Sequence, residues 1–263
     1  MSKLLKYTII CTLILVIGSA AFFAIDKGWS KSTSYSEQEA GDSIIEDIES
    51  IFESEYDKKV RELANWKRPE GQFKVALQAG HWKANEAPEE FPNLRENTGT
   101  SGGGKTEWQV NLEIAEKTKA ILESQGITVE ILPATIPKEY WADLFIAIHA
   151  DGNLDQSTTG YKAAAPRRDM TGRAADFVKV LEEEYEKTTG LTYDPNVTRN
   201  MRGYYAFNWR RYEHSLHPMT TGVILETGFL TNPNDRRIIV NNQEKSAQGI
   251  STAVMKFKQQ YNL

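Results

Sequence analysis

The chain has 263 residues, of which 40% are hydrophobic, 25% are charged and 10% are aromatic, and its formal net charge is −5. This composition is typical of a globular protein and excludes wholesale disorder, a collagen and a bare coiled coil. A chain this acidic is not expected to bind nucleic acid. The single cysteine, Cys11, lies in an apolar leader, so a transition metal in the folded part would have to be held by His, Asp or Glu.

The leader from Tyr7 to Ile25 has 19 successive residues without a charge. A helix of this length spans about 28 Å, which is close to the hydrocarbon thickness of a bilayer. Lys3 and Lys6 precede it, and the positive-inside rule then places the rest of the chain outside the cell. We therefore expect residues 1–25 to be a single-pass membrane anchor or, if the chain is cut near Ser19, the signal segment of a secreted protein.

A tether and a helix are expected between the leader and the main domain. Residues 26–40 are rich in serine and poor in large aliphatic residues, as in a flexible linker. Ser43 and Glu46 fit a capping box, and the apolar pattern that follows predicts an amphipathic helix over residues 43–65. This helix could be a stalk, a dimerising strip or a helix docked on the main domain. The predicted organisation is thus a leader over 1–25, a tether and helix over 26–70, and a catalytic domain over 71–263.

The main domain alternates short apolar runs with longer helical patterns. The apolar runs predict strands at residues 73–79, 128–132, 143–150 and 222–227. The helical patterns cover residues 107–126, 171–188 and 234–263. This alternation predicts an α/β domain with a mainly parallel sheet flanked by helices. In such a sheet the ligand site lies at the carboxyl ends of the strands.

Four polar residues lie where that site is expected: His81, Glu107, His149 and Glu226. Alone, a histidine after a strand is more often a structural residue, and a glutamate at a helix start usually interacts with the helix dipole. Together they are more informative, because two histidines and one glutamate are a known catalytic zinc set. A second carboxylate could then take a proton from a water molecule. The long gaps between the four residues leave their convergence open.

Four blocks that contain these residues resemble the zinc-dependent N-acetylmuramoyl-L-alanine amidases in order and spacing. The blocks are VALQAGHW (75–82), TEWQVNLEIA (106–115), DLFIAIHAD (143–151) and VILETGFLTNPND (223–235). The resemblance implies that His81, Glu107 and His149 bind Zn²⁺ and that Glu226 is the catalytic carboxylate. It also implies that the partner is peptidoglycan and that the scissile bond joins N-acetylmuramic acid to L-alanine.

The sequence departs from the usual family pattern in three places. Trp82 and Lys83 follow the first histidine where the family usually has more glycine, and Asp151 stands where asparagine is commoner. The segment between the first two blocks is long, which leaves Glu90 and Glu96 as alternatives to Glu107. Another zinc-dependent peptidase or amide hydrolase, or a non-catalytic wall-binding protein on the same fold, are the rival interpretations.

The glycine-rich segment at residues 99–106 matches two other motifs. Gly99 to Thr106 satisfies the phosphate-binding P-loop pattern, and residues 99–103 match the serine nucleophile elbow. Both motifs require a preceding apolar strand, which the polar sequence before Gly99 does not provide. We therefore expect a flexible glycine loop that borders the cleft, and a nucleotide is not an expected partner.

Three features near the C-terminal third remain open. On a helix, His214 and His217 could share a metal, but Pro218 would disturb that helix, so surface or supporting roles are expected. The aromatic and basic stretch at residues 201–214 could line a groove for glycan and acidic stem peptides, or pack as a helix with a solvated basic face. Asn196 begins a glycosylation triplet by pattern only.

Overall fold

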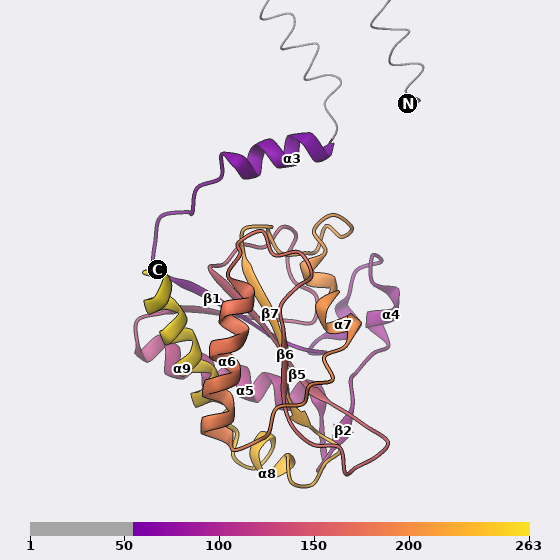
Figure 1. Cartoon of the computed structure of the whole chain (residues 1–263). Coiled ribbons are helices and arrows are strands. Elements are labelled where there is room, and N and C mark those ends of the chain that lie inside the picture. Colours follow the sequence, from indigo (N-terminus) through magenta and orange to yellow (C-terminus); the bar gives the residue numbers. More distant parts are fainter. Residues whose placement is uncertain (1–54) are drawn as a thin grey trace, which may run out of the picture. The chain divides into compact units, whose positions relative to one another are not determined.

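The computed structural model describes residues 55–263 of the chain (Figure 1). The chain divides into two units, residues 1–66 and residues 67–263. In the first unit, helix α3 (Glu55–Ala64) is described and falls within the helix expected over residues 43–65. The expected membrane segment, the serine-rich tether and the start of that helix lie outside the described residues. Within residues 55–263, no helix is long and apolar enough to span a bilayer.

The second unit is built on a five-stranded sheet with the order β4–β1–β5–β7–β6. Four neighbouring strands are parallel: β4 (Thr128–Leu132), β1 (Lys74–Ala79), β5 (Leu144–Asp151) and β7 (Thr221–Phe229). The edge strand β6 (Lys162–Ala164) runs antiparallel to β7. The prediction of a mainly parallel sheet is confirmed. Strand β6 was not predicted, because it is only three residues long and begins with a lysine.

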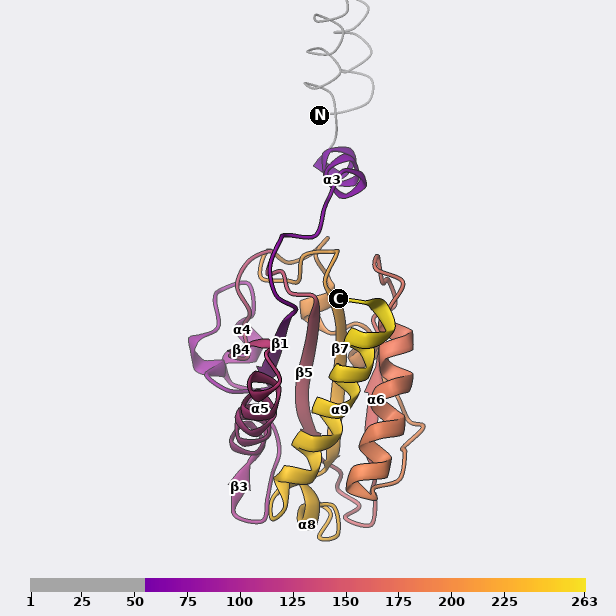
Figure 2. The same cartoon turned by 90° about the vertical axis from the view of Figure 1, so that its left-hand side faces the viewer.

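Three long helices cover one face of this sheet (Figure 2): α5 (Glu107–Ser124), α6 (Ala174–Thr189) and α9 (Gln243–Tyr261). Successive side chains of a strand point to opposite faces, so every second strand residue packs under these helices. Val75, Leu77 and Ile146 do so, in a single apolar cluster with residues of all three helices. Burial of this cluster removes a large apolar area from water and is the main stabilising contribution to the domain.

Two of the predicted helices differ from the observed ones at their ends. Helix α6 begins at Ala174 rather than at residue 171, because the Asp169 carboxylate accepts hydrogen bonds from the amides of Thr171 and Ala174 and so forms a turn. Residues 234–263, which were predicted to be mostly helical, form two helices, α8 (Arg236–Ile239) and α9. Asn241 and Asn242 stand at the break, and asparagine favours turns.

The opposite face of the sheet is covered by loops with short helical turns. These turns are η1 (Ala84–Glu86), α4 (Pro92–Arg95), α7 (Arg199–Arg202) and η2 (Tyr205–Phe207). A second apolar cluster lies here, in which Phe145 and Ile224 of the sheet pack with Ile136, Met201 and Leu216 of the loops. The long helices therefore lie on one side only, and the other face is called the loop-covered face below.

The register of the sheet brings the expected site residues to one edge. His149 of β5 and Glu226 of β7 are partners in the parallel ladder. Each follows by two residues a side chain that packs on the loop-covered face, Ala147 and Ile224, so both point to that face. Strand β1, which His81 follows, lies on the other side of β5. A hairpin of β2 (Ser101–Gly102) and β3 (Lys105–Thr106) leads into α5 and Glu107.

Candidate active site

Three side chains with metal-binding atoms meet at the carboxyl ends of β1 and β5 and the start of α5. His81, Glu107 and His149 each offer a ligand atom, and these atoms all lie within 4.8 Å of one another. Glu107 Oε1 is 3.0 Å from His149 Nδ1 and 3.5 Å from His81 Nε2. Among the described residues, no other group of three His, Cys, Asp or Glu side chains converges in this way.

Local backbone geometry positions each of the three. His81 has a φ of 63°, a left-handed conformation that non-glycine residues rarely adopt, and it turns the chain directly after β1. Glu107 is the first residue of α5, whose start is fixed by a capping box between Thr106 and Gln109. His149 is held within the ladder of β5. The donors therefore come from rigid element ends.

The Glu107 carboxylate is held in the ionised form by its neighbours. Burial alone would raise its pKa, but the hydrogen bond with His149, the nearby charge of His81 and the Thr100 amide together lower the pKa of Glu107 to about 2. Thr100 donates its amide to Glu107 Oε2 at 2.9 Å, and Ala150 donates its amide to Oε1 at 3.3 Å. A negative charge is thus stabilised between the two imidazoles.

The two histidines differ in their electrostatic environment. Burial lowers the pKa of His81 below 6.5. Burial also disfavours the charged form of His149, but its hydrogen bond with Glu107 and the nearby charge of Glu226 keep its pKa above 6.5. A negative environment around His149 favours any positive charge between the imidazoles, whether a proton or a metal ion.

Each imidazole has its second ring nitrogen next to a protein oxygen. His81 Nδ1 is 2.8 Å from the carbonyl oxygen of Asn97, which can only accept. His149 Nε2 is 3.4 Å from the hydroxyl of Tyr204, and that hydroxyl donates to Gln78 Oε1 at 2.8 Å. Both outer nitrogens are therefore donors, and when the imidazoles are neutral both inner nitrogens direct lone pairs toward Glu107. Metal-binding histidines usually have this arrangement.

Glu226 lies beside this group as a second, chemically different carboxylate. Burial raises the pKa of Glu226 to about 8, with added repulsion from Glu107 and Asp151 and opposing attraction from His149 and Lys162. Its Oε2 atom is buried and has no hydrogen-bond partner within the described part of the chain. An unpaired buried carboxylate oxygen is costly, so this atom is available to a substrate or a water molecule.

A buried lysine supports the Glu226 side of the site. Lys162 is 4% exposed and is the ladder partner of Glu226 on β6. Its ammonium is 2.7 Å from Asp151 and 2.9 Å from Asp194. Burial opposes the charge, but these two carboxylates keep the pKa of Lys162 above its ordinary value. The ion triad ties the end of β5 to the loop at Asp194.

The convergence depends on two glycines and a tyrosine that the sequence did not identify as functional. A Cβ atom at Gly80 would lie 2.4 Å from the His149 ring, and one at Gly99 would lie 2.3 Å from Glu107 Oε2. Tyr204 reaches His149 from a distant part of the chain. Gly80 precedes a candidate histidine, Gly99 begins the glycine-rich segment expected to border the cleft, and Tyr204 lies in the aromatic and basic stretch, but none of these signals assigned the residue to the site.

The site borders a cavity of about 460 Å³. Its lining includes His81, Glu107, His149 and Glu226. Leu154 also lines it and is fully exposed, so it offers an apolar contact to a ligand.

The alternative ligands Glu90 and Glu96 lie elsewhere. Glu96 is exposed. Glu90 accepts hydrogen bonds from the amides of Glu213 and His214 and lies 2.9 Å from His214 Nδ1. His217 accepts the amide of Met219, and no helix spans residues 213–218. His214 and Glu90 thus join two surface segments.

The glycine-rich segment, expected to be a flexible loop, forms a hairpin. Gly103 and Gly104 form its turn with positive φ values, and Lys105 pairs with Glu113 of α5. Gly99 and Thr100, which precede β2, line the cavity, so the prediction that this segment borders the cleft is confirmed.

The aromatic and basic stretch at 201–214 is not one helix. It contains the end of α7, the turn η2 and then a loop. Asn196 of the glycosylation triplet donates to Asp194 from its amide and its side chain.

The sequence profile of the family described as N-acetylmuramoyl-L-alanine amidase matches residues 75–256. This range includes all four polar residues and more than half of the chain. The chain belongs to this family. The resemblance drawn from the four sequence blocks is confirmed, and residues 67–263 are called the amidase domain below.

Individual relatives agree with this assignment. The amidase AmiA of Salmonella typhimurium is 23% identical over 207 residues, which are 61% of this chain and 72% of AmiA. The amidase LytC of Bacillus subtilis is 26% identical over 175 residues, covering 62% of this chain and 33% of LytC.

Solved structures share the fold of the amidase domain. The amidase Ami1 of Mycobacterium smegmatis superposes with a TM-score of 0.53 at 18% identity, covering 72% of this chain and 97% of that chain. For the amidase AmiC2 of Nostoc punctiforme the TM-score is 0.51 at 16% identity, with coverages of 73% and 99%.

The contact between Gly80 and the His149 ring generates the first prediction. In Gly80→Ala the new methyl group must displace the imidazole, and we expect amidase activity to fall about 10²-fold, as for a misplacement of about 1 Å in an active site. The measurements are turnover on peptidoglycan and the thermal unfolding midpoint. Gly249→Ala in α9 is the control, because its closest new contact is 3.1 Å and it should retain activity. Equal activity of the two variants would contradict the argument.

Proposed function

We propose that this amidase hydrolyses the amide that joins the lactyl group of N-acetylmuramic acid to the L-alanine of peptidoglycan stem peptides. The observation that carries the proposal is the convergence of His81, Glu107 and His149 in one cavity with the buried carboxylate of Glu226. Family membership over residues 75–256 supports the same reaction.

We further propose that His81, Glu107 and His149 hold a zinc ion. Two imidazole nitrogens and one carboxylate oxygen are a donor set that catalytic zinc sites use. The hydrogen bonds of the site indicate whether these three side chains fit a cation. If both outer nitrogens carry the protons, the inner nitrogen of His149 and the Glu107 carboxylate direct lone pairs at each other across 3.0 Å. Such a contact is repulsive unless a cation lies between the two atoms.

A zinc ion at this position would lower the pKa of a water molecule and polarise the scissile carbonyl group. The residues of the chain supply the rest of the mechanism. The free Oε2 of Glu226 accepts a proton from the attacking water and returns it to the leaving amine of L-alanine. Lys162 and its two aspartates hold the start of β6 beside the end of β5, so that Glu226 stays directed at the cavity.

The central test is Glu226→Gln. Glutamine keeps the size of the side chain but cannot accept a proton at neutral pH, so we expect a folded, zinc-containing variant whose activity is lower by about 10² to 10⁴. The measurements are the release of stem peptides from purified peptidoglycan and the zinc content.

The ligand variants are the controls for this test. His81→Ala and His149→Ala remove donor atoms and should lose zinc and activity together. Near-normal turnover of Glu226→Gln would exclude it as the base, and loss of zinc from that variant would make it a ligand and reopen the role of Glu107.

The hydroxyl of Tyr204 offers a test of the metal site that does not depend on activity. It faces His149 Nε2, and loss of such an outer contact typically weakens metal binding about 10- to 100-fold. We expect Tyr204→Phe to bind zinc roughly tenfold more weakly in competition with a chelator.

The neighbouring Tyr205 provides a matched control. Its hydroxyl accepts from Gln78 and donates to the Ala134 carbonyl, but no contact joins it to His149. In Tyr205→Phe the amide of Gln78 keeps two carbonyl acceptors, on Pro133 and Ala134, so zinc affinity should stay close to that of the wild type. Equal losses in the two variants would mean that general packing, and not the histidine contact, determines affinity.

We also propose that the chain is exported and held in the cell membrane by residues 7–25. The uncharged leader and the preceding Lys3 and Lys6 support this location, and peptidoglycan lies outside the membrane. A reporter fused after Leu263 should be active outside the cell and sediment with membranes. A shortened chain in the medium would instead identify the leader as a cleaved signal segment.

A further inference from the structure

A groove rich in arginine lies on the loop-covered face, separate from the catalytic cavity. Arg167, Arg168, Arg202 and Arg210 line it with Phe207 and Trp209, and its volume is about 240 Å³. It shares no lining residue with the cavity that contains Glu226. We refer to these six residues as the basic groove.

The basic groove concentrates positive charge on a chain whose net charge is −5. No acidic residue lines it. Within residues 55–263, the guanidinium groups of Arg167, Arg168 and Arg202 have no hydrogen bond or salt bridge to a protein acid. Arg210 lies over the Trp209 ring, 5.0 Å from its centroid. The guanidinium groups of Arg167, Arg168 and Arg202 are therefore suited to bidentate binding of carboxylates.

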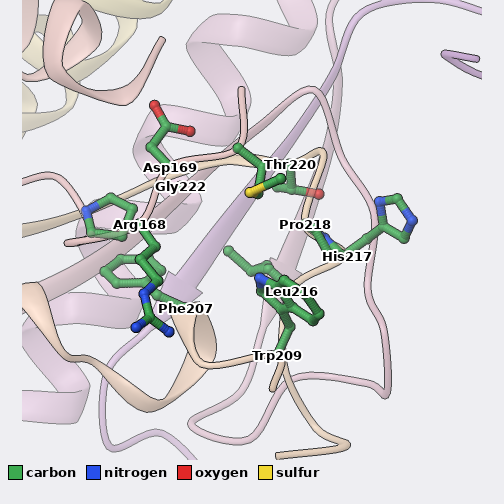
Figure 3. A pocket seen from close by; sticks show the side chains of 11 residues that line it. Arg168, Asp169, Phe207, Trp209, Leu216, His217, Pro218, Thr220 and Gly222 are labelled. Carbon is green, nitrogen blue, oxygen red and sulfur yellow. The ribbon is translucent and has the colours of Figure 1, made fainter. Parts of the chain in front are cut away.

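One acidic residue is close in sequence but does not neutralise the groove. In Figure 3 the carboxylate of Asp169 and the guanidinium of Arg168 point in opposite directions. The Asp169 carboxylate accepts the amides of Thr171 and Ala174 at 2.9 and 2.7 Å, so it is committed to the start of α6. The positive charge of Arg168 therefore remains available.

The groove is formed by two distant segments that are bonded to each other. Arg167 donates its amide to the carbonyl of Arg202 at 3.2 Å. The side chain of Asn208 donates to the carbonyls of Gly203 and Tyr204 at 2.9 and 3.1 Å. The backbone around the arginines is thus held by internal hydrogen bonds, and a ligand would meet a largely preformed frame.

An aromatic and apolar surface continues from the groove. Phe207 and Trp209 also line an adjoining hollow with Leu216 and Pro218 (Figure 3). Trp209 is only half-buried, so part of its indole can contact the apolar face of a sugar ring or an aliphatic side chain. Arginines beside such a surface fit a ligand that is both apolar and anionic.

The direction of β6 relates the groove to the catalytic cavity. Lys162, at the start of β6, pairs with Glu226, and Ala164 pairs with Ile224. The chain then reaches Pro166, which lines the same hollow as Gly222. Glu226 and Gly222 are four residues apart on one strand, or about 13 Å. An extended peptide of about four residues covers this distance.

We propose that the basic groove is a second, non-catalytic binding site for the carboxylates of peptidoglycan stem peptides. This inference rests on the proposed function, because that reaction places an acidic stem peptide in the catalytic cavity. Stem carboxylates bound in the groove hold the polymer on the enzyme while its scissile amide lies near Glu226. The loop at residues 199–209 joins the two sites, since it carries Arg202 on the groove and Tyr204 beside His149.

The test measures binding separately from hydrolysis. The full-length chain carrying Glu226→Gln is incubated with purified, insoluble peptidoglycan from which phosphate-containing wall polymers have been extracted, and the bound fraction is measured by sedimentation. Adding Arg168→Glu and Arg202→Glu should weaken binding about tenfold, which corresponds to about 1.4 kcal/mol. Arg168→Gln with Arg202→Gln should weaken it in the same direction but less, and thermal unfolding checks that each variant is folded.

The matched control changes the net charge by the same amount outside the groove. Arg199→Glu with Arg237→Glu reverses two exposed arginines that do not line it, and this variant should bind like its parent. Equal weakening by the two double reversals would attribute the effect to net charge and overturn the proposal.

A chemical arm identifies the group that is recognised. In this arm, the carboxyl groups of peptidoglycan are converted to amides. The parent chain should bind this amidated polymer weakly, with about the affinity that the double-reversal variant has for native peptidoglycan. Undiminished binding of the amidated polymer, or binding that requires the phosphate-containing polymers, would overturn the assignment to stem carboxylates. Failure of the proposed function would appear separately, as an absence of stem-peptide release by the chain with Glu226 intact.

Discussion

The carboxylate of Glu107 is the contact on which the geometry of the site depends. One oxygen accepts the amide of Thr100, and the other faces both imidazoles and the amide of Ala150. These partners come from the segment before the β2–β3 hairpin, from the turn after β1 and from the end of β5. The glycines that permit the approach have no tolerance for a side chain, since a methyl group at Gly80 or Gly99 would overlap the site. The convergence therefore rests on close backbone packing.

The two glutamates of the site have opposite environments, and this difference separates their chemical roles. Glu107 is surrounded by donors and cationic partners, which hold its pKa at about 2, whereas burial without a hydrogen bond to Oε2 raises the pKa of Glu226 to about 8. A group that is always ionised suits a ligand, and a group with a higher proton affinity suits a base. A cation held by Glu107 and the histidines would favour the ionised form of Glu226 as well.

The fold was predictable where the sequence carries a local signal. Buried parallel strands are continuous apolar runs, which is why β1, β5 and β7 were found, whereas the edge strand β4 alternates exposed and buried residues. The polar residues that interrupt or follow the apolar runs marked the edge of the sheet. Strand β6 is too short for such a signal. Its position follows from the ladder with β7 and from the buried ammonium of Lys162 between two aspartates, which are tertiary features.

The supporting contacts of the site are also tertiary features, so they could not be predicted from the sequence. Tyr204 is 55 residues from His149 and 126 from Gln78 in sequence, and no periodic pattern relates residues at such distances. The stretch at 201–214 was identified as aromatic and basic, and it contains four of the six residues of the basic groove. The remaining two, Arg167 and Arg168, follow β6 and are brought there by a backbone hydrogen bond from Arg167 to Arg202.

The antiparallel direction of β6 explains why one segment of the chain contacts both the catalytic edge of the sheet and the basic groove. A parallel strand would begin at the opposite edge of the sheet and end near Glu226, so its first residue could not be the ladder partner of Glu226. Because β6 is antiparallel, Lys162 lies at the catalytic edge and the chain then runs back toward Gly222. One short strand thus places the ammonium that supports the catalytic edge at its start and the arginines of the basic groove just after its end. The catalytic edge and the groove are therefore coupled through the same backbone, and the sequence between Lys162 and Arg168 has to satisfy both.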